Sequence, residues 1–430
     1  MDGFQPSEIS HLIGLNDSGL EDYEILYKEL HSHPEISHQE FDTAKIVAGK
    51  LRTLPGLEVH ENIGGTGVAA VLRNGPGKTV LLRSELDALP ILEETHLPFA
   101  SKKTMRDESD GVIKPVMHAC GHDMHMVCLL AALDTLVATQ QTWTGTLVVV
   151  FQPAEELGEG AQRMVDGGLY DLVPIPDVLM AQHVVAKPVG RIGMRSGVML
   201  AGSDSLKLTF RGRGGHASMP DRAIDPVVMA AGTVMRLQTI VSRQISPSQE
   251  FAIVTVGSLN TGQAANIIPQ KAEMQVNIRT AHPETRKKVL ASIERIAKAE
   301  SSASGAEEEP LIETITNFPI TENDKTTTER LQSTFKTVFL DQFDPEWPRS
   351  NASEDFTKLG LAVGKPCCFW FLGCISRKTW DDAEKKERIA EDIPVNHSAS
   401  FAPAIRPTLE IGRSAMVAAA LTFLSKSKNV

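Results

Sequence analysis

The chain has 430 residues, of which 42% are apolar, so its length and composition predict two domains that each bury a core. Its 43 basic and 54 acidic residues give a net charge of −11, which argues against nucleic acid or an anionic membrane as a partner and favours a small-molecule substrate. No apolar run approaches the roughly 18 residues of a membrane span, and the first residues lack the pattern of a signal peptide. Five cysteines, with Cys367 and Cys368 adjacent, argue against a disulfide framework, so we expect reduced thiols and a cytoplasmic location.

The N-terminal part of the chain predicts helices followed by a pair of strands. Residues from about 18 to 54 carry the apolar spacing of helices, interrupted at a proline. His31 and His33 lie at this break, and we interpret them as turn residues rather than metal ligands. Two apolar runs, Gly67–Arg73 and Thr79–Arg83, are separated by a polar turn and predict a β-hairpin.

Two carboxylates directly follow the second of these strands. Glu85 and Asp87 lie where the strand ends, and ligands bind at this edge of open α/β sheets. We therefore expect a role in a site for Asp87, with capping of a turn as the alternative. The polar stretch at 101–114 is predicted to be a surface loop.

The densest group of reactive side chains is the stretch Met117–His125. It places one thiol, three imidazoles and one carboxylate in nine residues, immediately before an apolar helical run at Met126–Leu133. Thiolate and imidazole are preferred ligands of zinc and its neighbours, so this stretch predicts a metal site. Local packing of the same side chains is the alternative interpretation.

Two further strands lead into acidic side chains and a histidine. The apolar run Gly145–Gln152 is typical of a central buried strand and leads into Glu155 and Glu156. Because burying unpaired charge is costly, we interpret these adjacent carboxylates as a functional pair. A strand at 177–182 ends at His183, which by itself would be a core residue. Its position matches that of the other strand ends, so we expect all these side chains to converge with the cysteine- and histidine-rich stretch.

From about Val198 the pattern changes to strands and helices in the order β-α-β-β-α-β. This order is the ferredoxin-like motif, which forms a compact domain by itself, so we expect an inserted domain. The predicted elements are strands at 205–211, 251–256, 272–279 and 311–316 and helices at 225–243 and 283–300. The predicted division is a main domain formed by residues 1–197 and 318–430, interrupted by an inserted domain at 198–317.

After the inserted domain the pattern of alternating helices and strands returns. The predicted elements are a helix at 328–339, an acidic turn at 353–356, a strand at 367–372, a charged loop at 376–392, and a helix at 408–424. His397 lies between the loop and the last helix. This alternation places the main domain in the α/β class.

Metals held by cysteine, histidine and glutamate, with a free carboxylate beside them, make a hydrolase. The metals lower the pKa of a water molecule and polarise a carbonyl, and the carboxylate carries a proton to the leaving nitrogen. Because Glu155 and Glu156 are neighbours, one can bind metal while the other faces the substrate.

Two alternatives to a metal-dependent hydrolase stay open at this point. Cys120 lies just ahead of a helix start, which favours its thiolate form and suits a metal ligand. The same position suits a nucleophile, with His122 or His125 as its base, as in thiol amidases. The surplus of ligand side chains at other strand ends disfavours that mechanism. The second alternative is a catalytically silent metal-binding protein of the same fold.

These residues resemble the co-catalytic metal amidohydrolases, which include aminoacylases, hippurate hydrolases and plant indole-acetyl-amino-acid hydrolases. The resemblance covers nearly the whole chain, and the cysteine-containing motif with Gln152–Glu156 is its most specific part. The matching motifs are Leu30–Glu35, Arg83–Pro90, His118–His125, Phe151–Glu156, Gly212–Ser218, Asn266–Pro269, Ser353–Phe356 and Asn396–Ser398. The resemblance implies an α/β metallopeptidase-type catalytic domain with an inserted ferredoxin-like lid and dimerisation domain.

The resemblance also implies two divalent metal ions, for which the thiol favours zinc over manganese. The implied ligands are Cys120, His122, Glu156, His183 and His397. Cys120 would bridge the two ions, and Glu155 becomes the general base and acid. Asp87 would orient a ligand without binding metal itself, and His118 and His125 become supporting residues.

Three residues of the inserted domain are implied to act on the substrate. His216 resembles the imidazole that stabilises the oxyanion, either in its own chain or from the partner of a homodimer formed through the lid, and Asn266 would assist it. Arg279 would hold a substrate carboxylate. The alternatives are that His216 caps a turn, that Asn266 precedes a turn, and that Arg279 is a solvated strand residue.

The chain departs from the family pattern at one motif. Relatives usually carry Asp at the position of Glu85 and Ala at the position of Ser84. The longer Glu85 side chain affects the expected metal preference more than the expected reaction. The predicted function is hydrolysis of the amide bond of N-acyl or N-aroyl amino acids, or of a related small amide or dipeptide.

Overall fold

A computed structural model describes residues 3–14 and 19–427, and these residues form two compact units. Unit 1 contains the described residues up to Met199, Glu322–Pro348 and the described residues from Asp355 onward, and unit 2 contains Leu200–Thr321 and Arg349–Glu354. The mixed α/β architecture with a large sheet confirms the predicted fold class. Within the described ranges, no helix is both long and apolar enough to cross a membrane.

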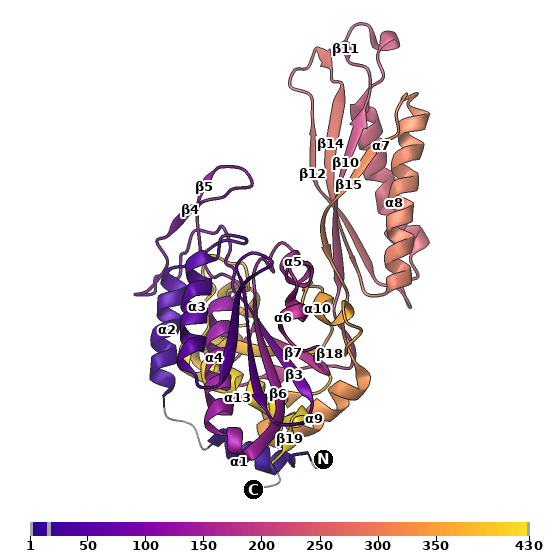
Figure 1. The fold of residues 1–430 in the computed structure, drawn as a ribbon. Helices are drawn as coiled ribbons and strands as arrows, with labels where there is room; N and C mark the ends of the chain where they lie inside the picture. The colour runs from indigo at the N-terminus through magenta and orange to yellow at the C-terminus, as the bar shows by residue number, and fades with distance from the viewer. Residues whose placement is uncertain (1–2, 15–18, 428–430) are drawn as a thin grey trace. The chain divides into compact units, whose positions relative to one another are not determined.

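One large sheet lies at the centre of unit 1 (Figure 1). In the described residues its strands follow the order β1-β2-β6-β3-β7-β18-β8-β17, and β19 pairs with β6. The strands are β1 (Leu57–Ile63), β2 (Gly67–Asn74), β3 (Thr79–Glu85), β6 (Trp143–Gln152), β7 (Val178–Pro188), β8 (Ile192–Gly193), β17 (Phe343–Asp344), β18 (Cys367–Ile375) and β19 (Ser425–Lys426). Because β3 is parallel to β6 and β7, and β7 is parallel to β18, the carboxyl ends of these four strands point the same way.

The predicted hairpin between Gly67–Arg73 and Thr79–Arg83 is wrong. β6 lies between these two strands, antiparallel to β2 and parallel to β3. β2 instead forms a hairpin with β1. The reason lies in β6, whose carboxyl half is completely buried and therefore needs a hydrogen-bonded strand on each side.

Helices cover the sheet of unit 1, and α4 and α13 pack against each other and against β3 and β7. The helices are α1 (Pro6–Gly14), α2 (Leu20–Ser32), α3 (Phe41–Thr53), α4 (His122–Ala138), α5 (Gly160–Asp166), α6 (Leu169–Leu172), α9 (Lys325–Phe339), α10 (Thr357–Leu361), α11 (Arg377–Lys385), α12 (Ile389–Asp392) and α13 (Ile405–Phe423). A Cβ added to Gly412 of α13 would lie 2.5 Å from the Sγ of Cys128 in α4. The glycine therefore allows the two buried helices to approach closely.

Two segments that were predicted as loops contain regular structure. Residues 376–392 form α11 and α12, and the Ser376 side chain accepts a hydrogen bond from the Thr379 amide at the start of α11. Because this segment is highly charged, it was predicted to be a loop although Ser376 is a typical helix-capping residue. The segment at 101–114 contains part of a short antiparallel pair, β4 (Thr104–Arg106) and β5 (Ile113–Pro115).

Unit 2 has the predicted β-α-β-β-α-β order. Its elements are β10 (Gly202–Arg211), β11 (Gly215–His216), α7 (Pro226–Thr239), β12 (Ala252–Thr261), β13 (Ile267–Ile268), β14 (Lys271–Thr280), α8 (Pro283–Ala303) and β15 (Leu311–Phe318). The four long strands form an antiparallel sheet in the order β12-β14-β10-β15, and apolar side chains of α7 and α8 join its core. β9 (Gly197–Leu200) and β16 (Thr321–Asn323) lie where the chain passes between the units. The domain boundaries and the roles of the two units stay predictions.

Candidate metal centre

The site begins at the carboxyl ends of β3 and β6. Glu85 is the last residue of β3 and pairs with Gln152, the last residue of β6. The prediction that His183 ends a strand is wrong, because β7 continues past it alongside β18. The pairing of β3 with β7 stops at Arg83 and Ala181, each two residues before Glu85 and His183. His183 therefore lies level with the strand ends although its own strand continues.

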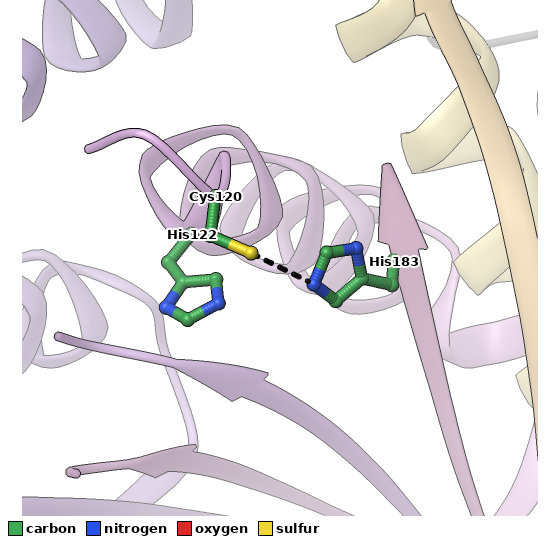
Figure 2. A group of neighbouring side chains, drawn as sticks. All are labelled: Cys120, His122 and His183. Carbon is green, nitrogen blue, oxygen red and sulfur yellow. Dashed lines mark hydrogen bonds between the residues drawn. The ribbon is translucent and has the colours of Figure 1, made fainter. Parts of the chain in front are cut away.

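Cys120 faces His183 from the turn that precedes α4 (Figure 2). The Cys120 Sγ lies 3.4 Å from the His183 Nε2. Gly121, between Cys120 and His122, has a left-handed φ of 84°, and an added Cβ would lie 2.4 Å from the Val184 side chain. Glycine is therefore needed here for the turn and for its close approach to β7.

His122 has one nitrogen fixed and the other directed at two carboxylates. Its Nδ1 donates to the backbone carbonyl of Asp87 at 2.8 Å. Its Nε2 lies 3.9 Å from the Glu156 Oε1 and 4.0 Å from the Glu155 Oε2. Among the described residues, neither the His122 Nε2 nor the Glu156 Oε1 has a hydrogen-bond partner, although both atoms are buried. Buried polar atoms without partners are costly, so this pair of facing atoms fits a bound cation.

A sharp turn after β6 presents Glu155 and Glu156. Ala154 has a left-handed φ of 44°, and its amide donates to the Glu40 Oε1 at 2.8 Å. The Glu156 amide donates to the Asp87 Oδ2 at 3.1 Å. Two other buried carboxylates therefore hold the strained turn that carries this acidic pair.

His397 comes from the last part of the chain and reaches the same carboxylate. It has a φ of 69°, and its amide donates to the Ala119 carbonyl at 2.8 Å. Its Nε2 lies 3.3 Å from the Glu156 Oε2. The preceding Asn396 donates to the Cys120 carbonyl at 3.2 Å. These hydrogen bonds to backbone carbonyls join the His397 turn to the turn before α4.

Within the described residues, the predicted ligand atoms fall into overlapping groups whose members lie within 4.8 Å of one another. These groups include Cys120, His122 and His183; Cys120, Glu156 and His397; and His122, Glu155 and Glu156. Thiol, imidazole and carboxylate are the ligands that zinc uses in proteins. The residues present therefore fit a metal centre, and the Cys120 thiol belongs to two of its groups.

The electrostatics of the site keep two of the predicted ligands protonated. Burial raises the pKa of the Cys120 thiol well above its ordinary value, and Glu156 adds to this effect. Burial lowers the pKa of His122, but Asp87 and Glu85 outweigh it and raise this pKa to about 10. The protein's own groups therefore do not favour the thiolate form that was predicted for Cys120. A metal that binds here has to displace these protons.

Other histidines of the sequence motifs have different surroundings. His31 is buried between Asp123, at 2.6 Å, and Glu93, at 3.0 Å. Burial lowers the pKa of His31, but these two carboxylates outweigh it and raise the pKa to about 9. His118 is buried, and neither of its nitrogens has a hydrogen-bond partner within the described residues. Its burial lowers its pKa to about 4.

Unit 2 brings His216 and Asn266 together and separates them from Arg279. His216 lies on β11, and the Ala217 amide donates to the Asn266 carbonyl at 3.1 Å. β11 follows the end of β10 that pairs with Lys271, and Arg279 lies eight residues further along β14. At about 3.4 Å per residue, this separation is about 27 Å. The Arg279 Nη1 donates to the backbone carbonyl of residue 351 at 2.6 Å.

Two residues that support the site were not predicted from the sequence. Glu40 immediately precedes α3, and its carboxylate accepts hydrogen bonds from the Ala154 amide and the Thr66 hydroxyl. Asn396 adjoins His397 in a motif that was recognised only for its histidine. An acidic residue at the start of a predicted helix is a weak signal, because such residues commonly stabilise helix N-termini.

Comparisons with known proteins place this geometry in context. The family model for peptidase family M20/M25/M40 matches residues 81–404. A hippurate hydrolase from Campylobacter jejuni is 40% identical over 290 residues, which cover 66% of this chain and 71% of that protein. Thermostable carboxypeptidase 2 from Saccharolobus solfataricus is 34% identical over 417 residues, which cover 95% of this chain and 97% of that protein. The chain also matches the crystal structure of the Bacillus subtilis YXEP protein, a dinuclear metal-binding peptidase from the M20 family. The TM-score is 0.72 and the sequence identity is 25%, and the match covers 93% of this chain and 98% of that protein.

We predict that zinc affinity rises with pH between about pH 6 and 9, because the raised pKa values of Cys120 and His122 leave protons that the metal must displace. The expected slope is about tenfold per pH unit for each proton released. Calorimetric titration in buffers of different ionisation enthalpy measures both the affinity and the number of protons. An affinity that does not change with pH would contradict this prediction.

Proposed function

The chain belongs to peptidase family M20/M25/M40 and is a metal-dependent amide hydrolase, and we propose that it cleaves the amide bond of N-acyl or N-aroyl amino acids. The observation that carries this proposal is the grouping of thiol, imidazole and carboxylate ligand atoms beside the Glu155 carboxylate. The similarity to a hippurate hydrolase supports an acylated amino acid as the substrate.

We propose two divalent ions, held by Cys120, His122, Glu156, His183 and His397. Cys120 would bridge them, which is supported by its membership of two ligand groups. The similarity to a dinuclear metal-binding peptidase supports two ions rather than one. The soft thiol favours zinc over manganese. Ions bound there would polarise the scissile carbonyl and lower the pKa of the attacking water.

Glu155 would act as the general base and then as the general acid. It is 5% exposed, and it lies on the same strained turn as Glu156. Its carboxylate would take a proton from the attacking water and pass it to the leaving nitrogen. Asp87 would be a positioning residue, because its backbone carbonyl accepts from His122 and its carboxylate accepts from the Glu156 amide.

His216 would stabilise the oxyanion as a hydrogen-bond donor. The Ser218 amide donates to the His216 Nδ1 at 3.1 Å, so this nitrogen is an acceptor and the ring proton lies on Nε2. A donor placed where negative charge develops lowers the barrier to acyl transfer. Asn266, whose backbone pairs beside His216, would assist it.

The distance within unit 2 supports a homodimer in which His216 comes from the partner subunit. Arg279 lies about 27 Å along β14, at 3.4 Å per residue, from Lys271, which pairs with the end of β10 that leads into β11 and His216. A small substrate cannot reach both side chains of one chain. If Arg279 binds the substrate carboxylate of the site in its own chain, His216 has to be supplied by a second copy.

A thiol-nucleophile amidase is disfavoured by the surroundings of Cys120. Burial and the neighbouring carboxylates raise its pKa, so its protonated form predominates at neutral pH. A nucleophilic cysteine needs the opposite environment, which is electropositive and lowers the pKa.

The cysteines also bear on the compartment in which the protein acts. The five described cysteines are all free and buried. We propose a cytoplasmic location, because free thiols persist in reducing compartments.

The second candidate function is that of a carboxypeptidase acting on small peptides. It is supported by the similarity to a thermostable carboxypeptidase along nearly the whole length of both chains. Acyl-amino acids and small peptides both present an amide bond next to an amino acid with a free carboxylate. The same residues would therefore perform either reaction.

We predict that a panel of acetyl-, benzoyl- and indole-acetyl-amino acids contains substrates that the protein hydrolyses, and that dipeptides are hydrolysed more slowly. Chelation should abolish turnover, and added zinc should restore it, because the metals activate water and carbonyl. Chromatographic detection of the free amino acid measures both results. Activity that survives complete metal removal would contradict the metal mechanism, and no turnover across the panel would favour a silent binding protein.

We predict that Glu155→Gln and His216→Ala are each inactive but that mixed dimers of the two regain activity. In a mixed dimer, one site would combine an intact Glu155 with an intact His216 from the other chain. Random mixing gives about a quarter of the wild-type number of sites. The assay uses unfolding and refolding of an equimolar mixture, with each variant refolded alone as the control. If the mixture stays inactive while both variants keep bound metal, His216 does not act from the partner.

A further inference from the structure

The backbone amide and carbonyl of Val184 connect several parts of the site. The His183 Nδ1 donates to the Val184 carbonyl at 2.7 Å, and the Asn396 side chain donates to the same carbonyl at 3.1 Å. Because a carbonyl can only accept, the ring proton of a neutral His183 lies on Nδ1. Its Nε2 lone pair then points toward the Cys120 Sγ, 3.4 Å away. The backbone at residue 184 therefore decides which nitrogen of His183 is free to bind metal.

His125 holds this backbone from the other side. The Val184 amide donates to the His125 Nε2 at 2.8 Å. An amide can only donate, so the His125 Nε2 is an acceptor and its lone pair is already used. The His125 Nδ1 lies 2.8 Å from the Glu85 Oε2 and donates to it. Although Glu85, His122 and His125 lie within 4.8 Å of one another, both nitrogens of His125 are committed.

Glu85 is itself fixed by a buried cation. The Arg83 guanidinium forms an ion pair with Glu85 and donates to the Gln152 side-chain oxygen at 2.9 Å. Arg83, Glu85 and His125 are all fully buried. The chain of contacts from Arg83 through Glu85 and His125 to the Val184 amide therefore has few alternative arrangements.

We propose that His125 is a positioning residue that fixes the backbone of Val184 through its amide and thereby orients the metal-binding nitrogen of His183, which donates to the Val184 carbonyl. His125 itself binds no metal. It acts as the link between the ion pair at the end of β3 and the ligand on β7. Hydrogen-bond partners of ligands commonly change metal affinity by about 10–100-fold when they are removed. This inference rests on the proposed role of His183 as a metal ligand.

The experiment compares two amide replacements of His125. A glutamine oxygen reaches the position of Nε2, so His125→Gln keeps an acceptor for the Val184 amide and loses the donor to Glu85. An asparagine nitrogen reaches the position of Nδ1, so His125→Asn keeps the donor to Glu85 and loses the Val184 contact. His60→Asn, on strand β1, is the matched control for replacing a histidine in unit 1.

The readouts are zinc affinity, measured by competition with a chelating dye, and the number of ions per chain at saturating zinc. The expected result is that His125→Asn weakens zinc binding by about 10–100-fold, that His125→Gln and His60→Asn weaken it by less, and that all three bind as many ions as wild type. Equal affinity in the Asn and Gln variants would overturn the proposal. Loss of a whole ion in either variant would also overturn it, because His125 would then be a ligand.

A second measurement tests the proposal on the wild-type protein without any substitution. Nitrogen-15 spectra of selectively labelled histidines, assigned with His125→Gln, report the tautomer of His125. The proposal requires a proton on Nδ1 and none on Nε2, and a proton on Nε2 would overturn it. If wild type binds no zinc at all, the proposed function fails, whereas a zinc-binding wild type with the wrong His125 tautomer defeats only this inference.

Discussion

The site depends on the neutralisation of carboxylates that are buried at one edge of the unit 1 sheet. Burial would raise the pKa of Glu85, but Arg83 and His125 hold it well below its ordinary value. The Asp87 carboxylate accepts hydrogen bonds from the Glu156 amide and the Ser37 hydroxyl, and these bonds offset part of the cost of burying its charge. Burial and the charge of Asp87 raise the pKa of Glu40 to about 7. Within the described part of the chain, the His122 Nε2 and the Glu156 Oε1 are left without hydrogen-bond partners, and a cation fits between these two facing atoms.

A centre assembled in this way links distant parts of the chain. The proposed ligands come from the turn before α4, the turn after β6, the middle of β7 and the turn before α13. Hydrogen bonds already join these elements, since the His397 amide donates to the Ala119 carbonyl and the Asn396 side chain donates to the Val184 carbonyl. The backbone therefore pre-orders the ligands, and little reorganisation is left for the metal to drive.

Local sequence patterns predicted much of this arrangement. The parallel strands β3 and β6 end level with each other, so Glu85 and Asp87 could be placed near Glu155 and Glu156 from hydrophobic pattern alone. The pairing partners of strands could not be predicted, because they depend on contacts between distant residues. This is why the expected hairpin was wrong and why the sequence did not predict that β7 continues past His183.

Supporting residues were the hardest part of the site to predict. His122 and His125 lie in one motif at one helix start, and only the resemblance to the family gave them different expected roles. Only the tertiary structure shows that the nitrogens of His125 are already used by Glu85 and Val184. The left-handed backbone conformations of Ala154 and His397 could not be predicted from the sequence either, because neither residue type favours that conformation as glycine does.

We propose that this chain builds a two-metal centre around the Cys120 thiol. The most direct test is a crystal structure of the zinc-loaded protein, with anomalous diffraction measured at the zinc absorption edge. We expect two zinc peaks, each about 2.3 Å from the Cys120 Sγ. A single peak, or two peaks with the thiol bonded to neither ion, would contradict it.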